Sequence, residues 1–425
     1  MTAGGLRRGP AKAYVIGAGL AGLAAAVKLA SAGVEVELSE AAAQAGGRCR
    51  SYFDAQLGLT IDNGNHLVLS GNQAVQQYLA MIGAADRLAG PDEARFVFAD
   101  VRSGERWTIR PSEGALPWWI FDPTRRVPGT NALDYLGLAS LLYPGPDKRV
   151  DQAIRAQGPL WERLMAPFLL AALNTAPEAG SAELAATVIR ETLAKGGRFY
   201  RPRVAHPTLS AAFIDPATDF LTRSGGSLRL GRRLRSLDFE GARLTALKFS
   251  DEDGPIPADR PVIFAVAPWV AQELVPGLAA PDEYRAIVNG HFRIAPPSGI
   301  EPMVGLVGGT VEWIFAFPDR ISVTVSGADR LLDTDRQALA EQLWAEVAKV
   351  HGLPSELPPW QVLKERRATF AATPDQAGKR PDAHTAWTNL TLAGDWTDTG
   401  LPATIEGALR SGFRAAELAL AQAAV

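Results

Sequence analysis

Residues 12–40 decide the fold, and they read KAYVIGAGLAGLAAAVKLASAGVEVELSE. Residues 12–16 are a short apolar run that ends at a glycine, residues 20–32 are rich in Ala and Leu, and residues 34–38 alternate between apolar and polar. This order predicts a strand, a helix that stops at Gly33, and a second strand. Together they make one βαβ unit of about 30 residues.

The turn between the first strand and the helix carries the pattern G-x-G-x-x-G. Its first glycine permits the tight turn, its second lets a pyrophosphate approach the backbone, and its third lets helix and strand pack closely. Because the helix N-terminus faces the anion, the residues expected to bind it are Gly17, Gly19, Leu20, Ala21 and Gly22. Glu40 ends the second strand, where a carboxylate accepts hydrogen bonds from a ribose diol. The sequence therefore predicts a dinucleotide site.

Length and composition exclude several classes of protein. The chain has 425 residues, with 43 Lys and Arg against 46 Asp and Glu, a net charge of −3. This length favours two or three domains, and the near-neutral balance argues against nucleic acid as a partner. With 47% hydrophobic residues the chain can bury a full core. The single cysteine, Cys49, excludes an internal disulfide and a multi-cysteine metal site, and it fits a reducing compartment.

No stretch of the sequence predicts a membrane span. The longest uncharged apolar stretches, residues 13–27 and 164–177, fall short of the ~18 residues that a span needs. Residues 1–11 contain Arg7 and Arg8 without a following glycine-free apolar core, so we expect a short mobile tail and no signal peptide.

Hydrophobic periodicity predicts further elements along the chain. We expect helices at 73–82, 151–173, 181–194, 334–351 and 404–421. We expect hairpins at 95–109 and 228–249, with turns at Ser103-Gly104 and Glu240-Gly241, and strands at 261–267, within 304–325 and at 390–392.

Two further segments point to FAD as the dinucleotide. Gly46-Gly47-Arg48 follows Glu40 closely, and Gly394-Asp395 follows a strand near the other end of the chain. This combination resembles the flavoprotein group that includes monoamine oxidases and carotenoid desaturases. The resemblance implies that Gly47 and Arg48 lie by the FAD phosphates and that Gly394 and Asp395 reach the pyrophosphate and ribityl chain.

The same resemblance places three more residues at the cofactor. It implies that the helix starting at Thr404 and Ile405 points its N–H groups at the flavin, and that Leu234 contacts the adenine. No second G-x-G-x-x-G follows a strand, so an external electron donor is expected. We expect noncovalent FAD, because Cys49 lies beside the glycine doublet and not in the C-terminal flavin segment.

Longer blocks narrow the resemblance over nearly the whole chain after residue 12. They are residues 61–72 (IDNGNHLVLSGN), 167–175 (PFLLAALNT), 365–370 (ERRATF) and 393–407 (AGDWTDTGLPATIEG). Together they resemble the squalene-associated FAD-dependent desaturases, understood as hydroxysqualene dehydroxylases of hopanoid synthesis. Asn65 stands where the family often carries Gln, and Arg366 where it often carries Lys. The first block implies that Gly64 and Asn65 also contact the cofactor.

What this family implies is a reductive reaction, in which hydroxysqualene loses its hydroxyl group and becomes squalene. Ionisation of an allylic C–O bond asks for a proton donor, an apolar cavity, and aromatic faces near the positive charge. His66 is the first candidate for the donor, because imidazole titrates near neutrality; the alternative is a histidine that only hydrogen-bonds backbone or cofactor. Asp62 is the second, although an Asp before Asn-Gly is often a turn former. Glu365 is a third, with a solvated salt-bridge face beside Arg366 and Arg367 as its alternative.

The aromatic run at residues 118–121 (WWIF) suggests contact with a bilayer, because the implied substrate is a membrane-dissolved C30 alcohol. Aromatic side chains beside the cations Arg125 and Arg126 suit the headgroup boundary. The alternative is that these aromatics line the substrate cavity or the core. Residues 164–173 likewise have two interpretations, a wall of the substrate tunnel or a contact with the membrane. The region of possible membrane contact is 115–175. We therefore expect a cytoplasmic protein at the inner face of the membrane.

The expected architecture is an α/β, Rossmann-like FAD-binding domain with a discontinuous α+β substrate domain. The FAD-binding domain comprises 1–75, 205–270 and 361–425, and the substrate domain comprises 76–204 and 271–360. Two other functions stay open: an oxidative flavoenzyme of the same fold, such as a polyprenyl desaturase or an amine oxidase, and a flavin-free prenyl-lipid carrier. The phosphate-binding glycines argue against the carrier. No metal site is expected, because the histidines lack ligand spacing.

Overall fold

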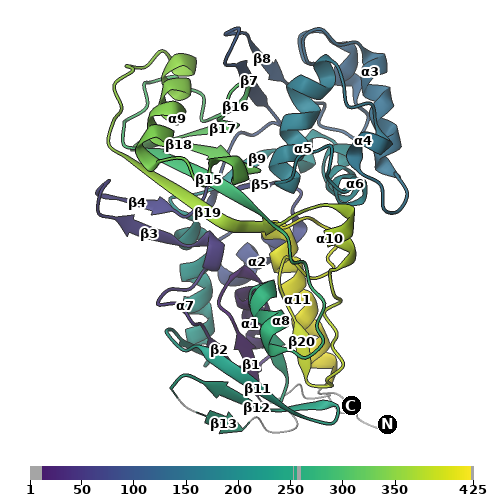
Figure 1. Ribbon diagram of the computed structural model, residues 1–425, viewed down its shortest axis with the longest axis vertical. Helices are drawn as coiled ribbons and strands as arrows, with labels where there is room; N and C mark the ends of the chain where they lie inside the picture. The colour runs from purple at the N-terminus through teal and green to yellow at the C-terminus, as the bar shows by residue number, and fades with distance from the viewer. Residues whose placement is uncertain (1–11, 252, 256–259, 423–425) are drawn as a thin grey trace, which may run out of the picture.

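The computed structural model describes residues 12–251, 253–255 and 260–422, and the tail expected at residues 1–11 lies outside them. Figure 1 shows an elongated molecule with a parallel sheet towards the end that holds both termini, and a second, larger sheet towards the other end. A lobe of helices lies beside the second sheet (Figure 1). The mixture of layers is the α/β architecture that the sequence predicts.

The first sheet has five parallel strands in the order β10-β2-β1-β14-β20. Their bounds are Ser227–Arg229, Glu35–Ser39, Lys12–Ile16, Val262–Phe264 and Leu390–Leu392. Helices α1 (Leu20–Ser31), α2 (Gln73–Ile82), α7 (Asp215–Arg223) and α11 (Ile405–Gln422) pack in the same region. At Gly412 a Cβ would lie 2.1 Å from the Ala21 carbonyl oxygen, so glycine permits the close approach of α11 to α1. The predicted βαβ unit is confirmed.

The hairpin predicted at 228–249 is wrong in its first strand. β10 pairs with β2 in the parallel sheet, and the hairpin consists of β11 (Leu234–Glu240) and β12 (Arg243–Phe249), to which β13 (Asp253–Pro255) adds. Gly231, at a φ of +71°, lies between β10 and β11, where the chain leaves one sheet for the other. The predicted turn at Glu240-Gly241 is confirmed.

The second sheet has seven strands in the order β19-β15-β18-β17-β16-β7-β8. Their bounds are Trp360–Phe370, Tyr284–Phe292, Arg320–Val325, Trp313–Phe317, Met303–Val307, Phe96–Asp100 and Arg106–Ile109. Alternate residues bury on opposite faces: Ile314 packs with helix α9 (Arg336–His351), and Phe315 packs with the helical lobe. The predicted hairpin at 95–109 is confirmed, whereas the long pair β15 and β19 was not anticipated.

The helix predicted at 151–173 is broken in the structure. Gly158 adopts a φ of +86° and precedes Pro159, so the chain leaves helix α4 (Val150–Ala153) and restarts. It then makes one π-helical turn, Trp161–Met165, ahead of α5 (Ala166–Leu173), whose Pro167 has no N–H to donate. The lobe also holds α3 (Ala132–Leu136) and α6 (Ala182–Glu191).

Short elements connect the two large sheets. Strands β3 (Ser51–Asp54) and β4 (Leu59–Asp62) form one hairpin, and β5 (Leu67–Leu69), β9 (Pro202–Ala205) and β6 (Leu88–Ala89) form a small antiparallel sheet. Helices α8 (Pro268–Leu274) and α10 (Pro374–Gly378) complete the described elements. Within the described residues, no helix combines the length and the apolar character needed to cross a bilayer.

Candidate active site

The glycine-rich turn forms an open cradle at the N-terminus of α1. A Cβ at Gly17 would lie 2.4 Å from the Ala265 carbonyl oxygen, and one at Gly22 would lie 1.8 Å from the Gly17 carbonyl oxygen, so neither position accepts a side chain. A Cβ at Gly19 would meet no atom within 4 Å. Gly19 is also the N-cap of α1 and supplies no side-chain hydrogen bond. The free N–H groups of Leu20 and Ala21 therefore begin the helix in front of open space, which suits an anion.

Glu40 is held beside this cradle. Its Oε2 accepts a hydrogen bond from the Ala18 N–H at 2.8 Å, and its Oε1 accepts one from the Ala42 N–H at 2.8 Å. Each carboxylate oxygen keeps a second lone pair for a ligand hydroxyl. The Arg232 N–H donates to the Glu40 carbonyl at 2.9 Å, and Leu234 follows two residues later at the start of β11. The backbone thus brings Leu234 to the same end of the sheet as Glu40.

Residues from both ends of the chain meet at Arg48. Gly46 pairs with Gly19 in an isolated parallel bridge, and Gly46 and Gly47 both have positive φ. The Arg48 guanidinium donates to Asp395 at 2.7–2.8 Å and to the Ala368 carbonyl. Residues 46–48 and 394–395 are therefore side by side, as the sequence predicts for residues that share a ligand.

The start of α11 is shaped in the same region. The Gly394 N–H donates to Ser411 on α11, and a Cβ at Gly394 would lie 2.3 Å from the indole nitrogen of Trp396, so only glycine fits there. Thr404 caps the helix, because its Oγ1 accepts the Gly407 N–H at 3.0 Å. The first turn, from Ile405, leaves N–H groups that are directed out of the helix end. Such groups stabilise negative charge at a bound ligand.

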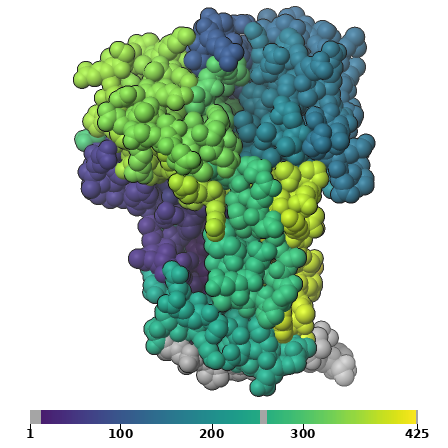
Figure 2. Space-filling model, in the orientation of Figure 1, coloured from purple at the N-terminus to yellow at the C-terminus, as the bar shows by residue number. Residues whose placement is uncertain are grey.

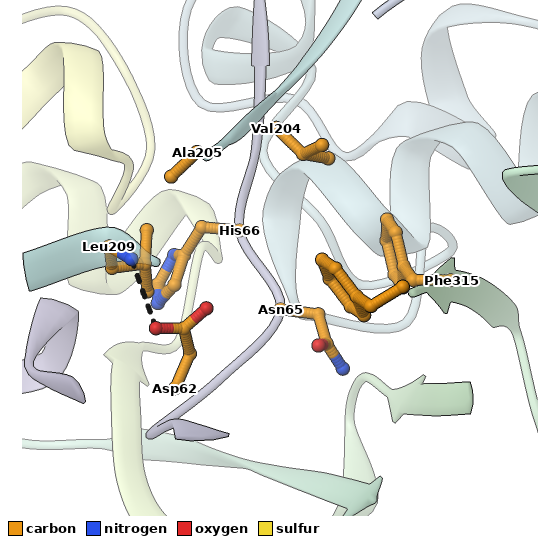
Figure 3. A pocket seen from close by; sticks show the side chains of 8 residues that line it. Asp62, Asn65, His66, Val204, Ala205, Leu209 and Phe315 are labelled. Carbon is orange, nitrogen blue, oxygen red and sulfur yellow. Dashed lines mark hydrogen bonds between the residues drawn. The ribbon is translucent and has the colours of Figure 1, made fainter. Parts of the chain in front are cut away.

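A small cavity, lined in part by Asn65 and His66, lies between the two large sheets. Figure 3 shows His66 and Asp62 together, with Asn65 and Phe315 across from them, and Val204, Ala205 and Leu209 completing the wall. Phe317 also lines the cavity. Apart from Asp62, Asn65 and His66, its walls are therefore apolar, and two of them are aromatic rings.

Comparisons with known proteins agree with this geometry. The family described as flavin containing amine oxidoreductase matches residues 20–420. The chain belongs to this family. Within it, a hydroxysqualene dehydroxylase of Rhodopseudomonas palustris is 54% identical over 96% of this chain and 98% of that protein, and one of Sinorhizobium fredii is 51% identical over 97% and 99%. The fold also matches the solved structure of an oxidoreductase from Methanosarcina mazei, with a TM-score of 0.73 at 16% identity over 96% of this chain and 100% of that one.

FAD is the cofactor of this flavin-containing amine oxidoreductase, and the described residues fit it. The open face of Gly19, the fixed carboxylate of Glu40, and the Arg48 cation at the junction of both chain ends suit a pyrophosphate and a ribose. Asn65 adds an unpaired group: its Nδ2 donates to the Val323 carbonyl at 3.2 Å and to Thr324 at 3.1 Å, while its buried Oδ1 has no partner among the described atoms. That oxygen is available to a ligand donor.

Burial shifts the pKa values of the two candidate acids in opposite directions. Desolvation, with the nearby Arg48 charge, lowers the pKa of His66 to about 4, so the free imidazole is neutral at pH 7. Burial raises the pKa of Asp62 above its usual value, although Ser51 and the Leu209 N–H donate to its Oδ1 at 2.6 and 3.0 Å. Asp62 is therefore already occupied by the fold, whereas the His66 ring lines the cavity and has a hydrogen bond with the Arg48 backbone, which opposes the lowering of its pKa. 

The surroundings of Glu365 differ from those expected, and three other site residues were not predicted from the sequence. Glu365 was expected beside Arg366 and Arg367, but among the described residues it makes no ion pair with either and instead receives a hydrogen bond from Asn63 at 3.4 Å. Asn289 of β15 contacts Asn65 and accepts from Thr324 at 2.8 Å. The available signal was an Asn directly after the apolar residues 286–288 of the strand. Phe315 and Phe317 looked like ordinary strand residues, and only the sheet directs them to the cavity.

Proposed function

We propose that this protein removes the hydroxyl group of hydroxysqualene reductively and releases squalene, as the names of its relatives state for those proteins. The observation that carries the proposal is the 54% identity, over nearly the whole of both chains, to a hydroxysqualene dehydroxylase. The lining of the cavity agrees with it, because the walls are apolar except for Asp62, Asn65 and His66. With a volume of about 10 Å³ the cavity has room for no more than a water molecule, so a hydrocarbon chain enters only when the walls move apart. We propose the same discontinuous FAD-binding and substrate domains that the sequence predicts.

The chemistry requires a proton and a hydride for each turnover. The allylic C–O bond breaks, and the leaving oxygen takes a proton and departs as water. A hydride then forms a C–H bond at the allylic cation. When bound, reduced FAD supplies that hydride. The electrons come from an external donor, since the chain carries a single G-x-G-x-x-G pattern after a strand.

The chain's own residues then have distinct tasks. Phe315 and Phe317 line the cavity and exclude water from it. The Arg320 guanidinium lies over the Phe317 ring, 4.1 Å from its centroid, so we assign the stabilisation of a developing allylic cation to Phe315. We propose that His66 holds the proton for the leaving oxygen, and that Asp62 is the second choice because its carboxylate is occupied. Burial is the main cause of the lowered His66 pKa, and the Arg48 charge is the second; phosphate groups beside Arg48 would offset only this second contribution.

A single-turnover experiment tests the reaction. The purified protein is reduced with dithionite without oxygen, mixed with hydroxysqualene, and followed by the flavin absorbance while squalene is quantified. We expect flavin reoxidation with one squalene formed per flavin. Reduced flavin that persists with hydroxysqualene, together with bleaching of the oxidised flavin by an amine or a polyprene, would assign the protein to the oxidative branch of the family.

A variant pair tests the proton donor. His66→Gln keeps a polar side chain but removes the titrating ring, and we expect single-turnover reoxidation to slow by at least 100-fold. The matched control is His384→Gln, since His384 is exposed and lies outside the cavity. Equal rates for wild type and His66→Gln would reject His66.

A further inference from the structure

Large apolar side chains gather at the surface of one part of the helical lobe. The described residues include nine exposed large hydrophobic side chains, and six of them fall within residues 116–143. We call these six the apolar surface: Leu116, Trp118, Phe121, Leu133, Leu136 and Tyr143, with 60–82% of each exposed. Such a concentration exceeds the scattered exposure of single side chains that a soluble surface normally carries.

The apolar surface is one structural unit and not a set of separate loops. Trp118 and Phe121 belong to a 3₁₀ helix, Trp118–Phe121, and Leu116 lies just before it. Leu133 and Leu136 belong to α3. Trp119 packs edge-on against Tyr135 of α3, with ring centroids 5.2 Å apart, and this contact joins the two elements. Figure 1 shows α3 at the end of the molecule opposite the parallel sheet, and Figure 2 shows the helical lobe forming one side of that end, beside the residues of α9 and the second sheet.

The charges within this segment balance, and one cation from outside it, Arg190, lies over the Tyr143 ring, 5.7 Å from its centroid. Residues 114–146 contain two cations, Arg125 and Arg126, and two anions, Asp122 and Asp134, so their net charge is zero. The two arginines donate to backbone carbonyls: Arg125 to Arg110 at 2.8 Å and Pro111 at 3.0 Å, and Arg126 to Ile120 at 2.8 Å. These cations therefore hold the segment in shape, and their contact with lipid headgroups stays a prediction.

The side chains beneath the apolar surface belong to the hydrophobic cluster that reaches the candidate active site. Trp119, Ile120, Leu138 and Leu142 pack into one cluster that also contains Trp161, Leu164 and Phe168 of the lobe and Phe315, Phe317 and Val204 of the cavity wall. One packed apolar cluster thus joins the segment beneath the apolar surface to the cavity wall beside Asn65 and His66.

We propose that the apolar surface inserts into the hydrocarbon edge of a lipid bilayer and admits the long-chain alcohol substrate from it. This inference rests on the proposed function, because a C30 alcohol resides in the bilayer. The neutral charge favours insertion of side chains over attraction to anionic headgroups, and it makes binding independent of salt. Trp118 and Tyr143 are of the types that prefer the interface, and Phe121 is of a type that enters the acyl boundary.

Vesicle flotation of the FAD-loaded protein tests the surface. We expect wild type to bind phosphatidylcholine vesicles and vesicles with 30% phosphatidylglycerol equally at low and high salt. The triple variant Trp118→Ser/Phe121→Ser/Leu133→Ser should bind at least 100-fold more weakly. Phe53→Ser is the matched control, since Phe53 is 68% exposed but lies on β3 outside the apolar surface, and it should bind like wild type. Flavin content and melting temperature confirm that each variant is folded.

The same variants separate this inference from the proposed function. With hydroxysqualene in detergent micelles, the triple variant should keep wild-type turnover; with hydroxysqualene in vesicles, it should lose at least tenfold. Equal vesicle binding by the triple variant, or binding that needs anionic lipid and disappears in salt, would overturn the inference. So would a wild-type dimer that the triple variant abolishes without any vesicle binding, because a second copy would then cover the surface. Vesicle binding without squalene formation in detergent would instead refute the proposed function alone.

Discussion

Replacing Gly19 and Gly22 separately with alanine distinguishes the cofactor cradle from protein packing. Gly19 has φ −71° and ψ 176°, which any residue adopts, and its Cβ would contact nothing. In the FAD-free protein Gly19→Ala should therefore be neutral or stabilising by about 0.4–1 kcal/mol. Gly22→Ala places a Cβ 1.8 Å from the Gly17 carbonyl oxygen, and such overpacking costs about 1–3 kcal/mol or more.

The two substitutions should weaken FAD binding for different reasons. In Gly19→Ala the added methyl group occupies the space in front of α1, so a pyrophosphate retreats and loses at least one charge-assisted hydrogen bond. That loss is worth about 1.5–3 kcal/mol, which corresponds to roughly 10- to 100-fold weaker FAD binding. For Gly22→Ala the binding loss should follow from the unfolded fraction.

Two measurements check this reasoning. Urea unfolding of FAD-free protein gives the stability of each variant, and titration with FAD, followed by quenching of flavin fluorescence, gives the affinity. Gly19→Ala that binds FAD within twofold of wild type would refute the cradle. Gly19→Ala that unfolds more than about 1 kcal/mol more easily would show that the position serves packing.

Three further predictions concern buried groups. Burial and Arg320 lower the pKa of His291 to about 3. Because the unfolded ring binds a proton near 6.5, the free energy of unfolding should fall by up to about 1.4 kcal/mol per pH unit as pH drops from 6.5 towards 3. Urea titrations should show a weaker dependence of this free energy on pH for His291→Gln. Burial raises the pKa of the Cys49 thiol to about 12, so the native protein should react with a thiol reagent at pH 8 far more slowly than the unfolded one, and acid precipitation should release all flavin. Glu406 accepts the Ala74 and Val75 N–H groups at 3.0 Å and so caps α2; Glu406→Gln should lower the free energy of unfolding by about 1–2 kcal/mol, with exposed Glu417→Gln as the unaffected control.

Local pattern determined the nucleotide-binding half of this protein. The alternation and glycine spacing of residues 12–40 specify a strand, a helix and a strand, because the backbone period and the need for glycine at a close approach act within a few residues. The hairpin at 95–109 was predictable for the same reason. The helix predicted at 151–173 missed a local signal, because Gly158 and Pro159 break it. Pairs that depend on distant partners, such as β15 with β19, were not predictable from local pattern.

Only the tertiary structure decided how distant segments meet. Arg48 and Asp395 are 347 positions apart in the chain and share an ion pair, and nothing local marks Asn289 as the neighbour of Asn65. The surface role of residues 116–143 was equally undetermined, because an aromatic run has the same composition whether it lies in a core or on a surface. Packing settled it by burying Ile120 and Tyr135 and leaving Trp118 and Leu133 exposed. Sequence periodicity reports which face of an element is apolar, but burial depends on what the rest of the chain brings against that face.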